Sequence, residues 1–309
     1  MKVFYSIDET EGLVPPTAFT MGTFDGIHVG HQAVIREVTR KGNGMVLSFD
    51  PNPKEVLLQE KFALLTNIDE KKAIFEQMGV SYLLIMSFDR NIANMQPDAF
   101  IEWLHTHIKF KEFIIGYNHR FGRGRSGDFE LLSSLGEKLG FKIKRVPLIM
   151  LNGAPVSSTR VRNLLGEGKV ATVKELLGRY YSFTGEVIPG ANRGRTLAYP
   201  TANLKVEEKK LLPKDGVYAV IAELDNEKYN GIMDIGTKPT FGDKFGVEIH
   251  LFDFNKNILG TKMKVECVNY IRENIAFPSP EALKDRIRLD EIKAREILKH
   301  GGDHGITKR

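Results

Sequence analysis

Cysteine is nearly absent from this chain of 309 residues, which contains only Cys267. A single cysteine cannot form an intramolecular disulfide, so the sequence does not point to an oxidising compartment, and a zinc site built on several cysteines is excluded. The N-terminal residues MKVFYSIDE lack the apolar core of a signal peptide, and the longest apolar runs, such as 82–86, are far too short to cross a bilayer. We therefore expect a soluble, cytoplasmic protein without membrane contact.

A large excess of charge is absent too. Lys and Arg number 44 against 39 Asp and Glu, which gives a formal net charge of +5 and a sequence pI of about 9.0. That excess permits anionic ligands but does not imply a nucleic-acid binder, which usually shows a clustered basic stripe. We expect small-molecule substrates and no nucleic acid, and the oligomeric state leaves no mark in the sequence. The chain length predicts roughly two domains.

The first half of the chain alternates between strand-like and helix-like stretches. Apolar runs of strand length at 45–49, 82–88, 112–116 and 142–150 lie among helix candidates at 32–41, 68–78, 97–108 and 129–139. Asn67 and Glu70 have the spacing of a capping box, and Gly140 is suited to end the last of these helices. This alternation predicts a parallel sheet with helices on its faces over residues 1–182, with ligands beyond the carboxyl ends of the strands.

The pattern changes in the second half, residues 183–309. Helical periodicity nearly vanishes between Phe183 and Ser279, and the apolar runs 217–224, 229–235, 247–252 and 263–270 are of strand length. A long amphipathic helix over about 280–300 follows, with Ser279 as its cap. Several strands followed by one helix predict a small antiparallel barrel that the terminal helix covers.

A glycine-rich turn at 21–31 follows a strand-like end at 18–20 and precedes a helix. Its glycines let the backbone approach a ligand, and the free N–H groups of the helix start suit a phosphate. His28 and His31 are three residues apart, so a helical start places them on one face, where they can donate hydrogen bonds to a triphosphate. A plain glycine turn with two surface histidines is the alternative; a zinc site ranks lower because no third ligand is near.

Near the end of this half, the stretch 156–162 places hydroxyl side chains at the start of another helix. Such hydroxyls commonly cap the backbone, which is one interpretation. They can equally hold phosphate oxygens, with Arg162 adding its charge. Together with the histidine turn, this stretch predicts the second side of a phosphate clamp.

No P-loop motif occurs in the second half, although glycines at 185–190 and 194 flank an arginine in a way that suits a loop over phosphates. Thr201 and Asn203 offer hard oxygen ligands appropriate to Mg²⁺, although a loop of turn residues explains this stretch equally well. The run 247–251 alternates strictly, so that Glu248 lies opposite the apolar face. It is either a solvated surface residue or a general base beside a bound alcohol.

The first of these motifs resembles a known family. His28-Val29-Gly30-His31 resembles the HxGH motif of the nucleotidyltransferase superfamily, and 156–162 is similar to its Ser-Ser-Thr-x-x-Arg motif. The stretches 22–31, 49–53 and 116–122 also resemble one family within that superfamily. This family is the adenylyltransferase module of prokaryotic bifunctional FAD synthetase. The resemblance implies a Rossmann-like domain with His28 and His31 as catalytic residues. It further implies ATP contacts from Gly22, Phe24, Asp25, Gly30, Asn118, Ser158, Thr159 and Arg162, and flavin contacts from Phe49, Pro51, Pro53 and Phe121. His119 stands where that family more often carries an aromatic residue.

The second half resembles riboflavin kinase. Pro200-Thr201-Ala202-Asn203 is similar to its PTAN motif, and 236–241, 248–251, Asp290 and 294–295 to its later motifs. The resemblance implies that Glu248 is the catalytic base and that Thr201 and Asn203 bind Mg²⁺. The implied ATP and flavin contacts of this half are Gly190, Gly194, Arg195, Thr201, Asn203 and Arg272. Ala198 stands where that family more often carries glycine.

Together the resemblances imply a bifunctional enzyme. Its C-terminal domain phosphorylates riboflavin to FMN, and its N-terminal domain transfers an adenylyl group from ATP to FMN, giving FAD and pyrophosphate, with Mg²⁺ in both reactions. The alternatives are a nucleotidyltransferase with another acceptor and a regulatory or inactive second half, a class I aminoacyl-tRNA synthetase, and a non-enzymatic flavin- or RNA-binding regulator.

Overall fold

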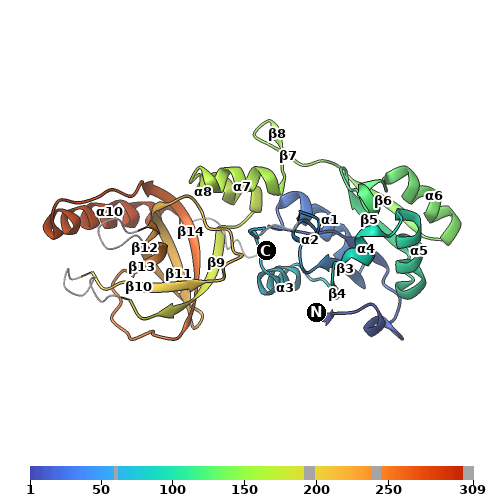
Figure 1. The fold of residues 1–309 in the computed structure, drawn as a ribbon, viewed down its shortest axis with the longest axis horizontal. Coiled ribbons are helices and arrows are strands. Elements are labelled where there is room, and N and C mark those ends of the chain that lie inside the picture. Colours follow the sequence, from blue (N-terminus) through green and yellow to red (C-terminus); the bar gives the residue numbers. More distant parts are fainter. Residues whose placement is uncertain (59–61, 191–198, 238–244, 302–309) are drawn as a thin grey trace. The chain divides into compact units, whose positions relative to one another are not determined.

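The computed structural model describes residues 1–58, 62–190, 199–237 and 245–301 (Figure 1). Its internal contacts divide the chain into two compact units, Met1–Ser158 and Thr159–Arg309. Helices α7 (Ser158–Gly166) and α8 (Val170–Leu177) precede the predicted boundary at residue 182, yet α8 contacts strands of the second unit. Gly194, Arg195 and Ala198 lie outside the described residues.

A six-stranded sheet forms the centre of the first unit. The strand order is β1-β4-β3-β2-β5-β6 and all neighbours are parallel, which confirms the predicted α/β class. The strands are β1 (Lys2–Phe4), β2 (Ala18–Met21), β3 (Gly44–Phe49), β4 (Tyr82–Met86), β5 (Glu112–Gly116) and β6 (Lys142–Val146). The predicted run 142–150 is shorter as a strand, because its ladder ends at the pairing of Gly116 with Val146, where the partner strand β5 also ends. A small hairpin follows, with β7 (Met150–Leu151) and β8 (Ala154–Pro155).

Helices cover both faces of this sheet because successive strand residues point to opposite sides. Met45 and Leu47 pack with residues of α5 and α6, whereas Val46 between them packs with residues of α1 and α3. The helices of this unit are α1 (Val29–Thr39), α2 (Pro53–Leu58), α3 (Ile68–Gln77), α4 (Arg90–Asn94), α5 (Pro97–Ile108) and α6 (Phe129–Leu139), with 3-10 turns η1 (Asp8–Thr10) and η2 (Arg123–Arg125).

Two of the predicted helix ends, at Asn67 and Gly140, are confirmed, whereas the predicted helix 32–41 spans Val29–Thr39. Asn67 Oδ1 accepts from Glu70 N at 2.9 Å, and Glu70 Oε2 accepts from Asn67 N at 3.0 Å, which completes the capping box. Gly140 ends α6 in the left-handed region, at φ +82°.

The second unit is a closed antiparallel barrel, as predicted, with strand order β10-β13-β12-β11-β14-β9. The strands are β9 (Tyr181–Ile188), β10 (Ala202–Val206), β11 (Gly216–Leu224), β12 (Glu227–Thr237), β13 (Phe245–Leu251) and β14 (Lys262–Arg272). The β11–β12 turn places Asp225 and Asn226 at φ +48° and +67°, a left-handed pair that suits a two-residue hairpin.

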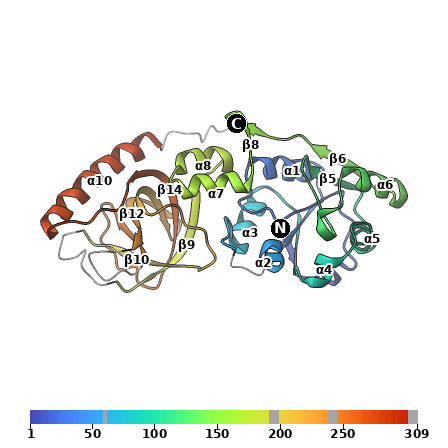
Figure 2. The same ribbon diagram turned by 45° about the horizontal axis from the view of Figure 1, so that its top comes forward.

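The terminal helix α10 (Pro280–Gly301) lies against the barrel, drawn in red in Figure 2. Ser279 Oγ accepts from Ala282 N at 3.2 Å, which confirms the predicted cap. Ala294 and Leu298 of α10 are buried together with Val217 and Ala219 of β11.

Candidate active sites

The predicted nucleotide residues of the first unit lie at the carboxyl edge of its sheet. Strands β2 and β5 are neighbours, but the chain continues from β2 to β3 on one side and from β5 to β6 on the other. This reversal of strand order opens the crevice in which α/β sheets bind ligands. The glycine-rich turn follows β2, and Asn118 follows β5, so both reach this crevice.

His28 is the N-cap of α1 and does not lie inside its first turn, which corrects the expected helical position. Its Nδ1 accepts a hydrogen bond from His31 N at 3.2 Å, and the two imidazole rings stack with centroids 3.6 Å apart. The expectation that both side chains share one side is therefore confirmed. Because Nδ1 is an acceptor, a neutral His28 carries its proton on Nε2, which can donate to a ligand.

His31 is a neutral hydrogen-bonding group at pH 7. Burial lowers its pKa well below the ordinary 6.5, and the nearby His28 and Lys71 lower it further. Within the described part of the chain, its buried Nδ1 has no hydrogen-bond partner. The ring also contacts that of Phe24 edge-on, at a centroid distance of 5.3 Å.

Close approaches explain the glycines of the turn. A Cβ on Gly30 would lie 3.1 Å from His28 Nδ1, and a Cβ on Gly22 would lie 3.2 Å from the Phe24 ring. Phe24 and Ile27 themselves adopt φ +46° and +40°, which is unfavourable for side chains of their size. The turn is thus held by its packing in a conformation that its residues do not prefer.

Asp25 fixes the turn from inside. Its carboxylate is 3% exposed, and its Oδ1 accepts from Leu65 N at 2.9 Å and from Thr66 N at 3.3 Å. Ser158 Oγ donates to the carbonyl oxygen of Asp25 at 2.8 Å. These contacts give Asp25 and Ser158 a positioning role, and their predicted contact with ATP stays a prediction.

The remaining predicted residues of this half are placed as follows. Asn118 is exposed in the turn that His119 N closes by donating to Gly116 O at 3.2 Å. Thr159 and Arg162 lie on α7 and group with the second unit. The rings of Phe49 and Phe121 are buried in the core of the first unit, while Pro51 and Pro53 are half-buried before and at the start of α2.

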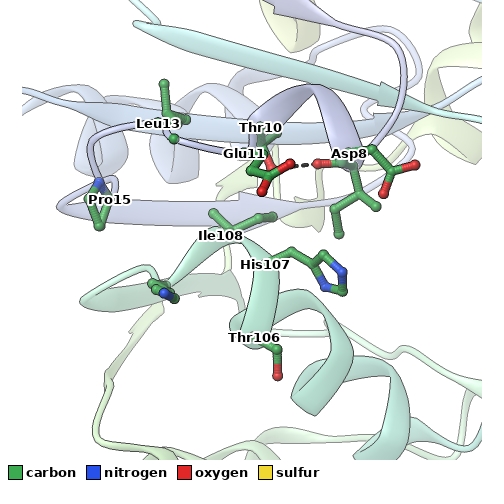
Figure 3. A pocket seen from close by; sticks show the side chains of 11 residues that line it. Asp8, Thr10, Glu11, Leu13, Pro15, Thr106, His107 and Ile108 are labelled. Atoms are coloured by element: carbon green, nitrogen blue, oxygen red, sulfur yellow. Dashed lines mark hydrogen bonds between the residues drawn. The ribbon is translucent and has the colours of Figure 1, made fainter.

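A pocket of about 600 Å³ lies elsewhere in this unit, between η1 and the end of α5 (Figure 3). Helix α5 ends just before β5 begins, so this pocket is at the amino edge of the sheet, opposite the histidine turn. Asp8, Glu11, Thr106 and His107 are among its lining residues, and no predicted site residue lines it.

In the second unit, a row of polar residues crosses adjacent barrel strands. Asn203 on β10 is directly opposite Glu248 on β13, and Glu248 is opposite Asp234 on β12. Directly paired residues have Cβ atoms about 5 Å apart, so these side chains share one face. The predicted alternation is confirmed, since Val247, Ile249 and Leu251 are buried and Glu248 is half-buried.

Contacts on either side hold the PTAN segment in place. A Cβ on Gly190 would lie 2.0 Å from Asn203 Nδ2, so only glycine leaves room for that amide. His250 Nδ1 donates to the carbonyl oxygen of Pro200 at 2.8 Å. Thr201 is exposed immediately before β10.

Arg272 anchors the terminal helix. Its Nε donates to Asp290 Oδ2 at 2.8 Å, its Nη2 is 2.7 Å from the same oxygen, and its Nη1 donates to Glu273 O at 2.8 Å. Asp290 is 2% exposed, so this is a buried ion pair. The predicted contact of Arg272 with a ligand stays a prediction.

Sequence reasoning did not single out Asp234, His250 or Lys71 as site residues. The position of Asp234 depends on strand register, and the positions of His250 and Lys71 depend on tertiary packing. Asp234 is opposite Glu248, and Lys71 is 3% exposed on α3. The sequence carries no signal for the last, because Lys71 and Lys72 are adjacent in one helix.

Both halves of the chain match known families. Residues 12–160 match the family model described as FAD synthetase, and residues 177–298 match that of riboflavin kinase. The chain is 36% identical over 298 residues to the bifunctional riboflavin kinase/FMN adenylyltransferase of Escherichia coli (strain K12), covering 94% of this chain and 93% of that protein. The Bacillus subtilis (strain 168) protein of that name is 33% identical over 290 residues, covering 90% and 91%.

A solved structure from Streptococcus pneumoniae, titled a macrolide-efflux protein, superposes with a TM-score of 0.86. It is 28% identical and covers 96% of this chain and 99% of that one. Within the residues described here, no helix combines the length and apolar character needed to span a membrane.

An α/β unit with a histidine-capped, glycine-rich turn and a closed barrel with a PTAN segment, matched to these two families, identify a phosphotransfer enzyme with two units. The chain belongs to the family of bifunctional riboflavin kinase/FMN adenylyltransferases. This confirms the predicted function: the enzyme phosphorylates riboflavin to FMN and adenylylates FMN to FAD, with ATP as co-substrate.

Proposed function

We propose that His28 and His31 carry out the adenylyl transfer by holding the phosphates of ATP. The observation that carries this assignment is the bond from His31 N to His28 Nδ1, which directs the His28 Nε2 proton away from the helix. A donor fixed in this way stabilises charge that develops on phosphate oxygens without reorganising during the reaction. The positive end of the helix dipole at the start of α1 supports the same anion site.

In this reaction a phosphate oxygen of FMN attacks the α-phosphorus of ATP. The bond from that phosphorus to the bridging oxygen breaks, and pyrophosphate leaves with the electron pair. Neither histidine forms a bond to phosphorus, because the incoming phosphate is already anionic at neutral pH. Positioning and charge neutralisation therefore supply most of the catalysis.

For the kinase reaction we assign Glu248 as the general base. Its carboxylate takes the proton of the terminal ribityl hydroxyl of riboflavin as that oxygen attacks the γ-phosphorus of ATP, and ADP leaves with the electrons of the broken bond. The direct pairing of Glu248 with Asn203 supports this role, because it places the base beside the proposed metal ligands.

The donors of the PTAN segment suit Mg²⁺. A hydroxyl and an amide oxygen are hard ligands, and Mg²⁺ usually completes its coordination with phosphate and water oxygens. We propose that Thr201 and Asn203 supply the protein oxygens. When bound, the ion neutralises the charge of the transferred phosphate.

We propose functional domains of residues 1–182 for adenylyl transfer and 183–309 for phosphorylation; the family matches to 12–160 and 177–298 support this order of the two activities along the chain. Incubation with riboflavin, ATP and Mg²⁺, followed by chromatography for FMN and FAD, tests the division. Glu248→Gln should abolish FMN formation and preserve FAD formation from added FMN, whereas His31→Ala should do the reverse. Equal loss of both reactions in a folded variant contradicts the assignment.

A further inference from the structure

One lysine of the first unit is buried against the nucleotide turn. Lys71 lies on α3, one turn before Phe75, so both side chains emerge on the same face of the helix. That face contacts the turn, because the Phe75 ring meets the Phe24 ring edge-on at a centroid distance of 5.8 Å. Lys71 is 3% exposed, whereas a lysine is almost never buried without a partner.

In the described part of the chain, the Lys71 ammonium makes neither a hydrogen bond nor a close ion pair, and the carboxylates that act on its charge, Asp25, Asp50 and Glu55, do so from a greater distance. Burial lowers its pKa, because a charge removed from water is destabilised. A second polar group of the same site, His31 Nδ1, is also buried without a hydrogen bond in that part of the chain. Two such groups that interact electrostatically point to a ligand that satisfies them.

The charged neighbours of Lys71 indicate which ligand its ammonium binds. Asp25, Asp50 and Glu55 interact with its charge, in that order of strength, and Lys71 in turn acts on His31. His31 belongs to the proposed ATP site. Asp50 and Glu55 belong to the segment around Pro51 and Pro53, which we predict to lie near the flavin. Lys71 is therefore placed where the two substrates meet.

We propose that the Lys71 ammonium binds the phosphate of FMN and holds it for attack on ATP. The attacking group is anionic and must approach a polyanionic triphosphate, so a fixed cation at the meeting point offsets their repulsion. Such a cation acts strongly because it is shielded from water. The assignment rests on the proposed function, which places ATP at His28 and His31.

A purely structural role for Lys71 predicts a different experimental result. If the charge of Lys71 served only to balance Asp25 and hold the turn, its removal would lower the stability of the first unit. It would then weaken the binding of ATP and of FMN to the same extent. A residue that binds the FMN phosphate affects FMN selectively. Since its burial is unfavourable without substrate, removing the charge should also leave the melting temperature unchanged or raise it.

The test is Lys71→Met, with Lys72→Met as the matched control on the next residue. Lys72 points elsewhere, with its ammonium 5.3 Å from the centre of the Tyr5 ring and 3.5 Å from Asp69 Oδ1. Lys71→Met should raise KM for FMN in adenylyl transfer about 10- to 100-fold, the value of a charge-assisted hydrogen bond. KM for ATP and riboflavin phosphorylation should stay unchanged, and Lys72→Met should change none of them.

Lys71→Gln serves as a second variant if methionine disrupts packing. An unchanged KM for FMN, or an equal rise in KM for ATP, would overturn the proposal. His31→Ala, measured alongside, separates the two levels of inference. If His31→Ala abolishes adenylyl transfer while Lys71→Met behaves like Lys72→Met, only the role of Lys71 fails. If His31→Ala keeps full activity, the proposed ATP site fails first.

Discussion

A methyl group at position 190 should disable the kinase reaction without unfolding the barrel. In Gly190→Ala, the new Cβ would lie 2.0 Å from Asn203 Nδ2, whereas an ordinary contact begins at 3.4 Å, so the amide must move by about 1.4 Å. The amide is the end of a side chain and can rotate, so the cost in folding free energy is small. The displaced group, however, is a proposed magnesium ligand directly opposite Glu248. A misplacement of about 1 Å costs roughly 100-fold in rate.

The assay is riboflavin phosphorylation at saturating ATP and Mg²⁺, with adenylyl transfer from added FMN as the internal control. We expect kcat/KM for riboflavin to fall about 100-fold while FAD formation from FMN is unchanged. Gly166→Ala is the matched control, since a Cβ there meets nothing within 4 Å. Wild-type phosphorylation by Gly190→Ala would refute the reasoning that Gly190 exists to make room for Asn203.

Three further predictions concern stability. Asp25→Ala leaves two backbone N–H groups of the buried turn unpaired and should lower the free energy of unfolding of the first unit by about 2–4 kcal/mol, measured in urea. Arg272→Met should cost about 3 kcal/mol in the barrel, because the buried Asp290 loses its closest partner; an unchanged urea midpoint would argue against it. Burial lowers the pKa of His119 from 6.5 to about 4. As the pH falls, the unfolded chain therefore binds a proton at this histidine before the folded chain does. Stability should therefore drop by about 3 kcal/mol between pH 6.5 and 4, and His119→Phe should drop less.

Features that depend on local spacing could be predicted from the sequence. The capping box at Asn67 and Glu70 and the alternation of Val247–Leu251 need only neighbours along the chain, and both are confirmed. The strand and helix alternation likewise predicted the parallel sheet, because it follows from the period of apolar residues.

Features that depend on packing between distant segments could not be predicted. Lys71 and Lys72 are adjacent lysines in one helix, and only the contact of α3 with the nucleotide turn decides which one is buried. The position of Asp234 opposite Glu248 requires the register of β12 and β13, which a single sequence does not fix. For the same reason, the association of α8 with β14 was not foreseen.

The His28 ring caps helix α1 and, in the proposed adenylyl-transfer site, also donates to phosphate, and this limits how the site can be re-engineered. A proton added at Nδ1 in acid would displace the backbone N–H of His31, so helix α1 would lose its cap at the same moment as the ring changed its charge. Asparagine at this position could preserve the helix start but not an imidazole donor. The helix cap and the proposed phosphate donor therefore depend on the same ring. A substitution that changes the donor also removes the cap, and the helix start must then be stabilised in another way.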